Sequence, residues 1–128
     1  MRSDLSDSLV KALLVVASQP RRRGSPYAAL LEKAVAAATP VEELTAIKER
    51  AKGFLQEATG RRRREAATLL YHTAVASAFV HHGAAISGRP AHKQLEVYER
   101  FAGEWGERPI GRLFREAARR IAGPGPIA

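Results

Sequence analysis

The side chains with the clearest potential for chemistry are the four histidines, three of which lie in the segment LLYHTAVASAFVHHGAAIS at residues 69–87. Two histidines on one helix can share a zinc ion only at a spacing of three or four residues. His72 and His82 are about 15 Å apart along a helix, while the adjacent His81 and His82 diverge by about 100°. The spacing therefore predicts no metal site, although His92 or carboxylates of other helices could complete one.

An ordinary structural role accounts for these histidines. His81 and His82 are expected near a helix C-terminus, where the partial negative charge favours the imidazolium form. His72 is expected to be half-buried and hydrogen-bonded.

Catalytic signatures are missing from the sequence. It has no G-x-S-x-G elbow, no phosphate-cradling glycine loop and no H-E-x-x-H motif, and its only aspartates are Asp4 and Asp7. The chain also has no cysteine, so a thiol nucleophile, a thiolate metal site and a disulfide are all excluded. We therefore expect a protein that is not an enzyme and holds no cofactor.

Arginine clusters are the stronger functional candidates. Ten arginines form three groups: Arg21, Arg22 and Arg23; Arg61, Arg62, Arg63 and Arg64; and Arg112, Arg115 and Arg119. The last group is expected to line one side of a helix, opposite the core-facing positions Ile110, Leu113, Phe114, Ala117 and Ile121. The second group opens a predicted helix, where each positive charge is unfavourable by roughly a few tenths of a kcal/mol. A bound phosphate would offset this cost, because helix N-terminal amides and guanidinium groups both suit phosphate. Alternatively, these arginines lie in water or pair with Glu57 and Glu65.

Composition indicates one globular domain with a basic surface. The chain has 128 residues, a hydrophobic share of 45% and a net charge of +8, with a pI near 10.6. Such a charge favours polyanions, including nucleic acid, acidic proteins and anionic lipid. Aspartates precede the first apolar run, where a signal peptide would be basic, so the cytoplasm is the expected compartment.

Helical periodicity extends along the whole chain and predicts an all-α fold, a single-domain bundle of five or six helices. The expected helices span about 4–18, 26–38, 40–58, 62–86, 90–105 and 109–121. Thr39, Pro40 and Glu42 form a capping box, and Thr59–Gly60 separates the third helix from the fourth. The bundle domain is expected at 1–122, followed by a disordered Gly/Pro tail at 123–128.

The segment 62–86 is expected to be the central, mostly buried helix of this bundle. Residues 66–88 carry no formal charge and are long enough to cross a bilayer, but their histidines, threonines and serine argue against a membrane span. The expected core positions are Leu69, Leu70, Val75, Phe79 and Val80.

Two functions of different classes fit these features. The first is a small module that contacts the phosphates of nucleic acid without reading sequence, as an accessory subunit of a larger assembly. The second is a protein–protein adaptor or self-assembling subunit whose arginines meet an acidic partner. The aromatic share of 6% favours the adaptor slightly, because single-strand binders usually stack bases on aromatic rings.

The histidine spacing leads to a first testable prediction. The purified protein should contain no stoichiometric zinc, and a chelator should leave its melting temperature unchanged, because no pair of histidines has ligand spacing. Elemental analysis and a thermal melt with and without chelator measure this, and one metal ion per chain would contradict it.

Overall fold

The computed structural model describes residues 39–57, 60–87 and 94–122 of the 128-residue chain. In these ranges every element is a helix: α3 (Val41–Glu57), α4 (Arg61–His82), α5 (Leu95–Trp105) and α6 (Pro109–Ala122). The prediction of an all-α fold is therefore confirmed for this part of the chain. The helices expected at 4–18 and 26–38, and the tail expected at 123–128, lie outside the described residues.

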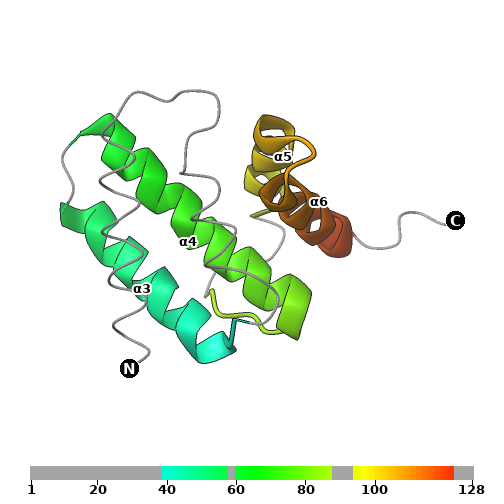
Figure 1. The fold of residues 1–128 in the computed structure, drawn as a ribbon, viewed down its shortest axis with the longest axis horizontal. Coiled ribbons are helices and arrows are strands. Elements are labelled where there is room, and N and C mark those ends of the chain that lie inside the picture. The colour runs from blue at the N-terminus through cyan, green and yellow to red at the C-terminus, as the bar shows by residue number, and fades with distance from the viewer. Residues whose placement is uncertain (1–38, 58–59, 88–93, 123–128) are drawn as a thin grey trace, which may run out of the picture.

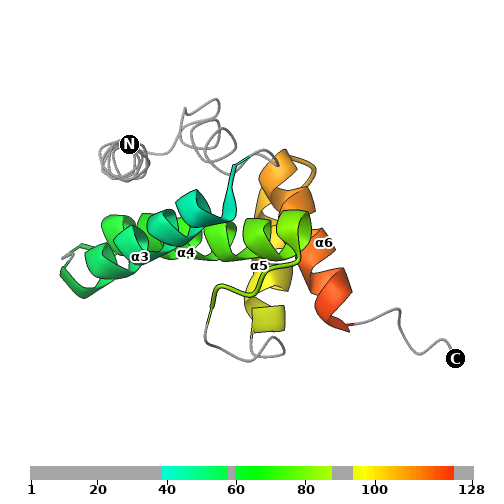
Figure 2. The same cartoon turned by 90° about the horizontal axis from the view of Figure 1, so that it is seen from below.

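Helices α3 and α4 lie side by side and run in opposite directions (Figures 1 and 2). The amides of Glu43 and Leu44 donate to the Pro40 carbonyl at 3.1 and 3.0 Å, so the hydrogen-bond ladder of α3 begins at Pro40, one residue after the expected cap Thr39. The predicted break before α4 is also present. Gly60 has a φ of 103°, which a residue with a Cβ rarely adopts.

Helix α4 is shorter than predicted, because it ends at His82 and not near residue 86. Gly83 adopts the left-handed conformation, with φ 64° and ψ 23°. Its amide donates to the Phe79 carbonyl at 3.1 Å, and the Ala84 amide donates to the Ala78 carbonyl at 3.0 Å. These bonds satisfy carbonyls of the last turn, as is common where a glycine ends a helix.

Helix α4 is also the most buried of the four helices, and it contacts both α3 and α6. Residues 73–78 are all buried, although six consecutive positions point to every side of a helix. Among the expected core positions, Leu69, Leu70 and Val75 are buried. The prediction of Phe79 and Val80 as core positions was wrong, because they belong to the last turn before Gly83 and are only partly buried.

Helices α5 and α6 form a second hairpin, which lies across the C-terminal end of α4 (Figure 2). Helix α5 begins at Leu95, five residues after the proline that was expected to open it. Helix α6 begins at Pro109 as predicted, where the missing N–H of proline costs nothing. The turn between them contains Gly106, whose positive φ of 59° suits glycine alone.

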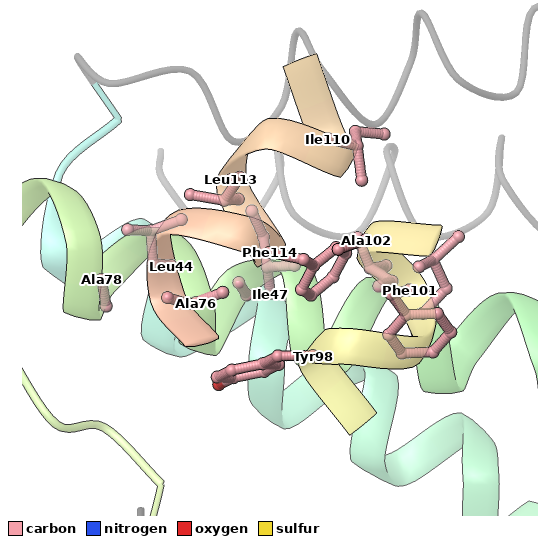
Figure 3. Close-up of a cluster of buried hydrophobic side chains, with 14 of the residues drawn as sticks. Leu44, Ile47, Ala76, Ala78, Tyr98, Phe101, Ala102, Ile110, Leu113 and Phe114 are labelled. Carbon is pink, nitrogen blue, oxygen red and sulfur yellow. The ribbon is translucent and has the colours of Figure 1, made fainter. Parts of the chain in front are cut away.

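Aromatic rings fill the space between α5 and α6 (Figure 3). The ring centroid of Phe114 lies 5.0 Å from that of Phe101 and 5.6 Å from that of Tyr98. The Tyr98 hydroxyl donates to Gln94 Oε1 at 2.7 Å, so its buried polar atom is satisfied. Aliphatic side chains of α3, including Ile47, belong to the same cluster, which therefore joins the two hairpins.

The α5–α6 hairpin also depends on a close backbone approach at Gly111. A Cβ at this position would lie 2.2 Å from the Gly106 carbonyl oxygen and 2.9 Å from the Trp105 carbonyl carbon. Gly111→Ala should therefore lower the free energy of unfolding by about 1–3 kcal/mol, because backbone atoms must move to admit the methyl group. Chemical denaturation monitored by circular dichroism measures this.

Gly103→Ala provides the matched control for Gly111→Ala. Gly103 is an exposed position of α5, and a Cβ there meets nothing within 4 Å. Alanine should therefore stabilise α5 by about 0.5–1 kcal/mol through helix propensity. Equal effects of the two substitutions would contradict the packing of Gly111 against the turn.

Candidate functional site

Four exposed arginines lie on one side of α6 and immediately before its first residue; they are here called the arginine row: Arg108, Arg112, Arg115 and Arg119. Spacings of four, three and four residues place them on one side of the helix, over about 16 Å. The exposed fractions of the side chains are 68% for Arg112, 52% for Arg115 and 65% for Arg119. On the opposite side, Ile110 and Phe114 are almost fully buried, so α6 divides into an apolar face and a basic face as predicted.

Glu107 draws two arginines of the row toward the turn between α5 and α6. Its carboxylate oxygens lie 3.8 Å from Arg112 Nε and 3.5 Å from Arg115 Nη1. Arg115 Nη2 also donates to the Gly106 carbonyl at 3.2 Å. The Glu107 side chain is 78% exposed, and ion pairs this long and this exposed are weak. The pairs with Glu107 therefore restrain Arg112 and Arg115 only weakly.

Glu116 holds the other end of the row more tightly. Both of its carboxylate oxygens accept hydrogen bonds from Arg119, and Arg120 Nε donates to Oε2 at 2.7 Å. Hydrogen bonds from Arg119 and Arg120 lower the pKa of Glu116 to about 2. The same carboxylate raises the pKa of Arg119. One carboxylate thus fixes the direction of two guanidinium groups.

Arg120 also links α6 to α4, because its Nη1 donates to the Val80 carbonyl at 3.0 Å. This carbonyl belongs to the last turn of α4, where a helix has partial negative charge. Burial of the imidazole lowers the pKa of His81, and the charges of His82 and Arg120 lower it further. The expectation that the helix end favours the imidazolium form is therefore wrong for His81, because burial and two basic neighbours outweigh the helix dipole.

The remaining histidines have structural surroundings. His72 is more buried than expected and packs against Phe101, with ring centroids 5.9 Å apart. The His82 ring nitrogen Nε2 lies 2.8 Å from the Thr39 carbonyl, which ties the end of α4 to the start of α3. His92 lies outside the described residues. Within residues 39–57, 60–87 and 94–122, no three His, Cys, Asp or Glu side chains are grouped to hold a metal ion.

The arginines that open α4 lie on a different surface from the arginine row. Arg61 pairs with Glu65 at 3.2 Å, as one of the two sequence-based alternatives proposed. Arg64 Nη1 donates to the Leu55 carbonyl at 2.7 Å, where it satisfies a carbonyl near the C-terminus of α3. Arg62 and Arg63 belong to the first turn of α4, and their side chains are outside the described part.

The two described clusters do not converge. Arg61 opens α4, and Arg120 of α6 contacts Val80, about 28 Å further along the same helix. Figure 1 shows α6 beside the C-terminal half of α4, away from its first turn. The third cluster, Arg21, Arg22 and Arg23, lies outside the described residues. The structure therefore places the arginine row and the start of α4 on two separate basic surfaces.

Sequence reasoning missed several members of the α6 surface. Arg108 and Arg120 were not among the predicted site residues, yet Arg108 extends the row and Arg120 anchors it. Glu116 had a readable signal, because glutamate three and four residues before arginine forms pairs along a helix. Glu107 had no such signal in the sequence, because its contacts with Arg112 and Arg115 depend on the shape of the turn.

The fold and the site together define a class: an all-helical protein with an exposed basic helix face. Comparisons with protein-family models, with curated protein sequences and with solved structures gave no significant match. In the described part of the chain, no helix has the length and apolar character needed to cross a membrane.

The pairing of Glu116 leads to a prediction about pH. Because its pKa is depressed in the folded protein, this pairing stabilises the fold at pH values above the ordinary pKa of 4.5 and is lost as pH falls through about 2. A carboxyl-detected NMR titration should therefore place the Glu116 midpoint near pH 2. In Arg119→Gln/Arg120→Gln, the midpoint should return toward 4.5. A wild-type midpoint already near 4.5 would contradict the pairing.

Proposed function

We propose that this protein associates with nucleic acid through its backbone phosphates and that the arginine row of α6 makes the contacts. The observation that carries the proposal is the row itself, in which Arg112, Arg115 and Arg119 are more than half exposed. Phosphate contacts of this kind fix position on a nucleic acid without reading its sequence. We propose the protein as an accessory subunit of a larger assembly and not as an enzyme.

The charge of the α5–α6 turn and α6 supports this proposal. Residues 106–122 contain five arginines and two glutamates, so a positive excess remains after the internal pairs are formed. A guanidinium group has five N–H donors, and Glu107 or Glu116 occupies only one or two donors of each paired arginine. Each arginine of these pairs can therefore donate to a phosphate oxygen while it keeps its carboxylate partner.

The test is a fluorescence titration of a labelled oligonucleotide at salt concentrations between about 50 and 200 mM. Binding should weaken steeply with salt, with a log–log slope of roughly −0.7 to −0.9 per phosphate neutralised, and base sequence should matter little. In Arg112→Gln/Arg115→Gln, the slope should become shallower by about two units, because two phosphate contacts are lost.

Arg50→Gln/Lys52→Gln is the matched control, since it removes the same charge from exposed positions of α3. This control should bind nearly as the wild type does, because its lost charges lie away from α6. An equal loss in both double variants would mean that net charge, and not the arginine row, causes binding. Absence of binding at the lowest salt concentration would reject the proposed function.

An acidic protein partner is the second candidate, and one observation favours it. The arginines of α6 already accept carboxylates, from Glu107 and Glu116, so carboxylates of another protein fit the same groups. In the same titration, this function predicts tighter binding to an oligo-glutamate peptide than to an oligonucleotide of equal charge. It also predicts a defined oligomer or a stoichiometric complex at physiological salt.

A further inference from the structure

We infer that the nucleic acid recognised by the arginine row is double-stranded DNA, in preference to a single strand or an RNA duplex. This inference rests on the proposed function, since it names the partner of the same surface. Three features of the described residues carry it: the placement of the aromatic rings, the internal pairing of the arginines, and the rigid mounting of the row on α6.

The aromatic rings argue against a single strand. Seven of the eight aromatic residues lie in the described part, and none of these seven is exposed. Tyr98, Phe101 and Phe114 are buried against one another, and Trp105 is partly buried against the same core. Proteins that bind single strands without sequence preference stack successive bases on exposed rings. The surface around the arginine row, as described, offers guanidinium groups without such rings.

The ion pairs that the row's arginines form with Glu107 and Glu116 favour a ligand of high charge density. A lone phosphate meets arginines whose positive charge is already partly neutralised by the carboxylates of Glu107 and Glu116. Duplex DNA carries about one negative charge per 1.7 Å of its axis, so the 16 Å of duplex beside the row carries roughly nine phosphates on its two strands. Release of the counterions condensed on such a polymer favours its binding over that of a small anion.

The position of the arginine row on a helix fixed by its buried side favours DNA over duplex RNA. The arginines project from one side of a 14-residue helix whose other side is fixed by buried Ile110, Phe114 and Ala117. The major groove of B-form DNA is about 12 Å wide and admits an α-helix. The major groove of A-form RNA is deep and narrow, and side chains cannot read it. The exposed side of α6 can therefore lie along the DNA groove, with the row directed at the flanking phosphates.

The experiment compares three labelled ligands of equal length, each of about 20 nucleotides per strand: duplex DNA, one of its single strands and the matching RNA duplex. Binding of the full-length protein is measured by fluorescence anisotropy between about 50 and 200 mM salt. Duplex DNA should bind at least about tenfold more tightly than either other ligand, with a slope near −0.9 per phosphate. Arg112→Gln/Arg115→Gln should remove this preference.

Glu107→Gln provides a variant that should gain affinity. Removing this carboxylate frees Arg112 and Arg115 and should tighten duplex binding about two- to fivefold. Glu99→Gln removes the same charge from an exposed position of α5 and should have a smaller effect. Equal effects of the two variants would mean that the pairs with Glu107 do not restrain the row.

The outcomes separate this inference from the proposed function. Binding to the single strand or the RNA duplex as tight as to duplex DNA overturns the inference but leaves the proposed function in place. Failure of all three ligands to bind at the lowest salt concentration overturns both.

Discussion

The burial of residues 73–78 of α4 on every side is the constraint on which the rest of the described structure depends. Residues 73–78 carry only short side chains, two of them polar, Thr73 and Ser77, which lets α3 and α6 pack closely against this helix. A buried polar group must find a partner, and the Thr73 hydroxyl does so within its own helix by donating to the Leu69 carbonyl at 2.6 Å. A helix buried in this way has no room for charge, so the charged groups are confined to its first turn and to the helices around it.

Glycine sets the direction in which α6 presents its charge. The positive φ of Gly106 allows a short turn, and the missing side chain at Gly111 allows α6 to touch the end of α5. With this contact fixed, Phe114 reaches the rings of Tyr98 and Phe101. The arginines on the opposite side of α6 must then face outward. The same backbone geometry therefore determines both the core of the α5–α6 hairpin and the exposure of the arginine row.

The sequence predicted what depends on local pattern and missed what depends on tertiary contact. Periodicity located α3, α4 and α6, and it separated the apolar face of α6 from its basic face. Burial of one side of a helix requires apolar residues every three or four positions, and this spacing can be read in the sequence. The end of α4 was placed too late, although Gly83 is an ordinary helix terminator. The lowered pKa of His81 could not be predicted, since its largest cause is burial in the folded protein and a smaller one is Arg120, which lies 39 positions further along the chain. The separation of the two described arginine clusters likewise follows only from the packing of α6 against one end of α4.

Glu107 and Glu116 change what the arginine row can recognise. Arg112 and Arg115 form ion pairs with Glu107, and Arg119 and Arg120 form ion pairs with Glu116. The hydrogen-bonded pairs with Glu116 restrict the side chains of Arg119 and Arg120, which reduces the entropy that binding must remove. They also compete with any small anion, because an exposed pair must be broken or shared before a new one forms. A surface that is ordered in this way and partly neutralised should bind single small anions weakly and a dense array of phosphates strongly. Internal pairing of the arginines is therefore compatible with polyanion binding, and it makes charge density the property that selects the ligand.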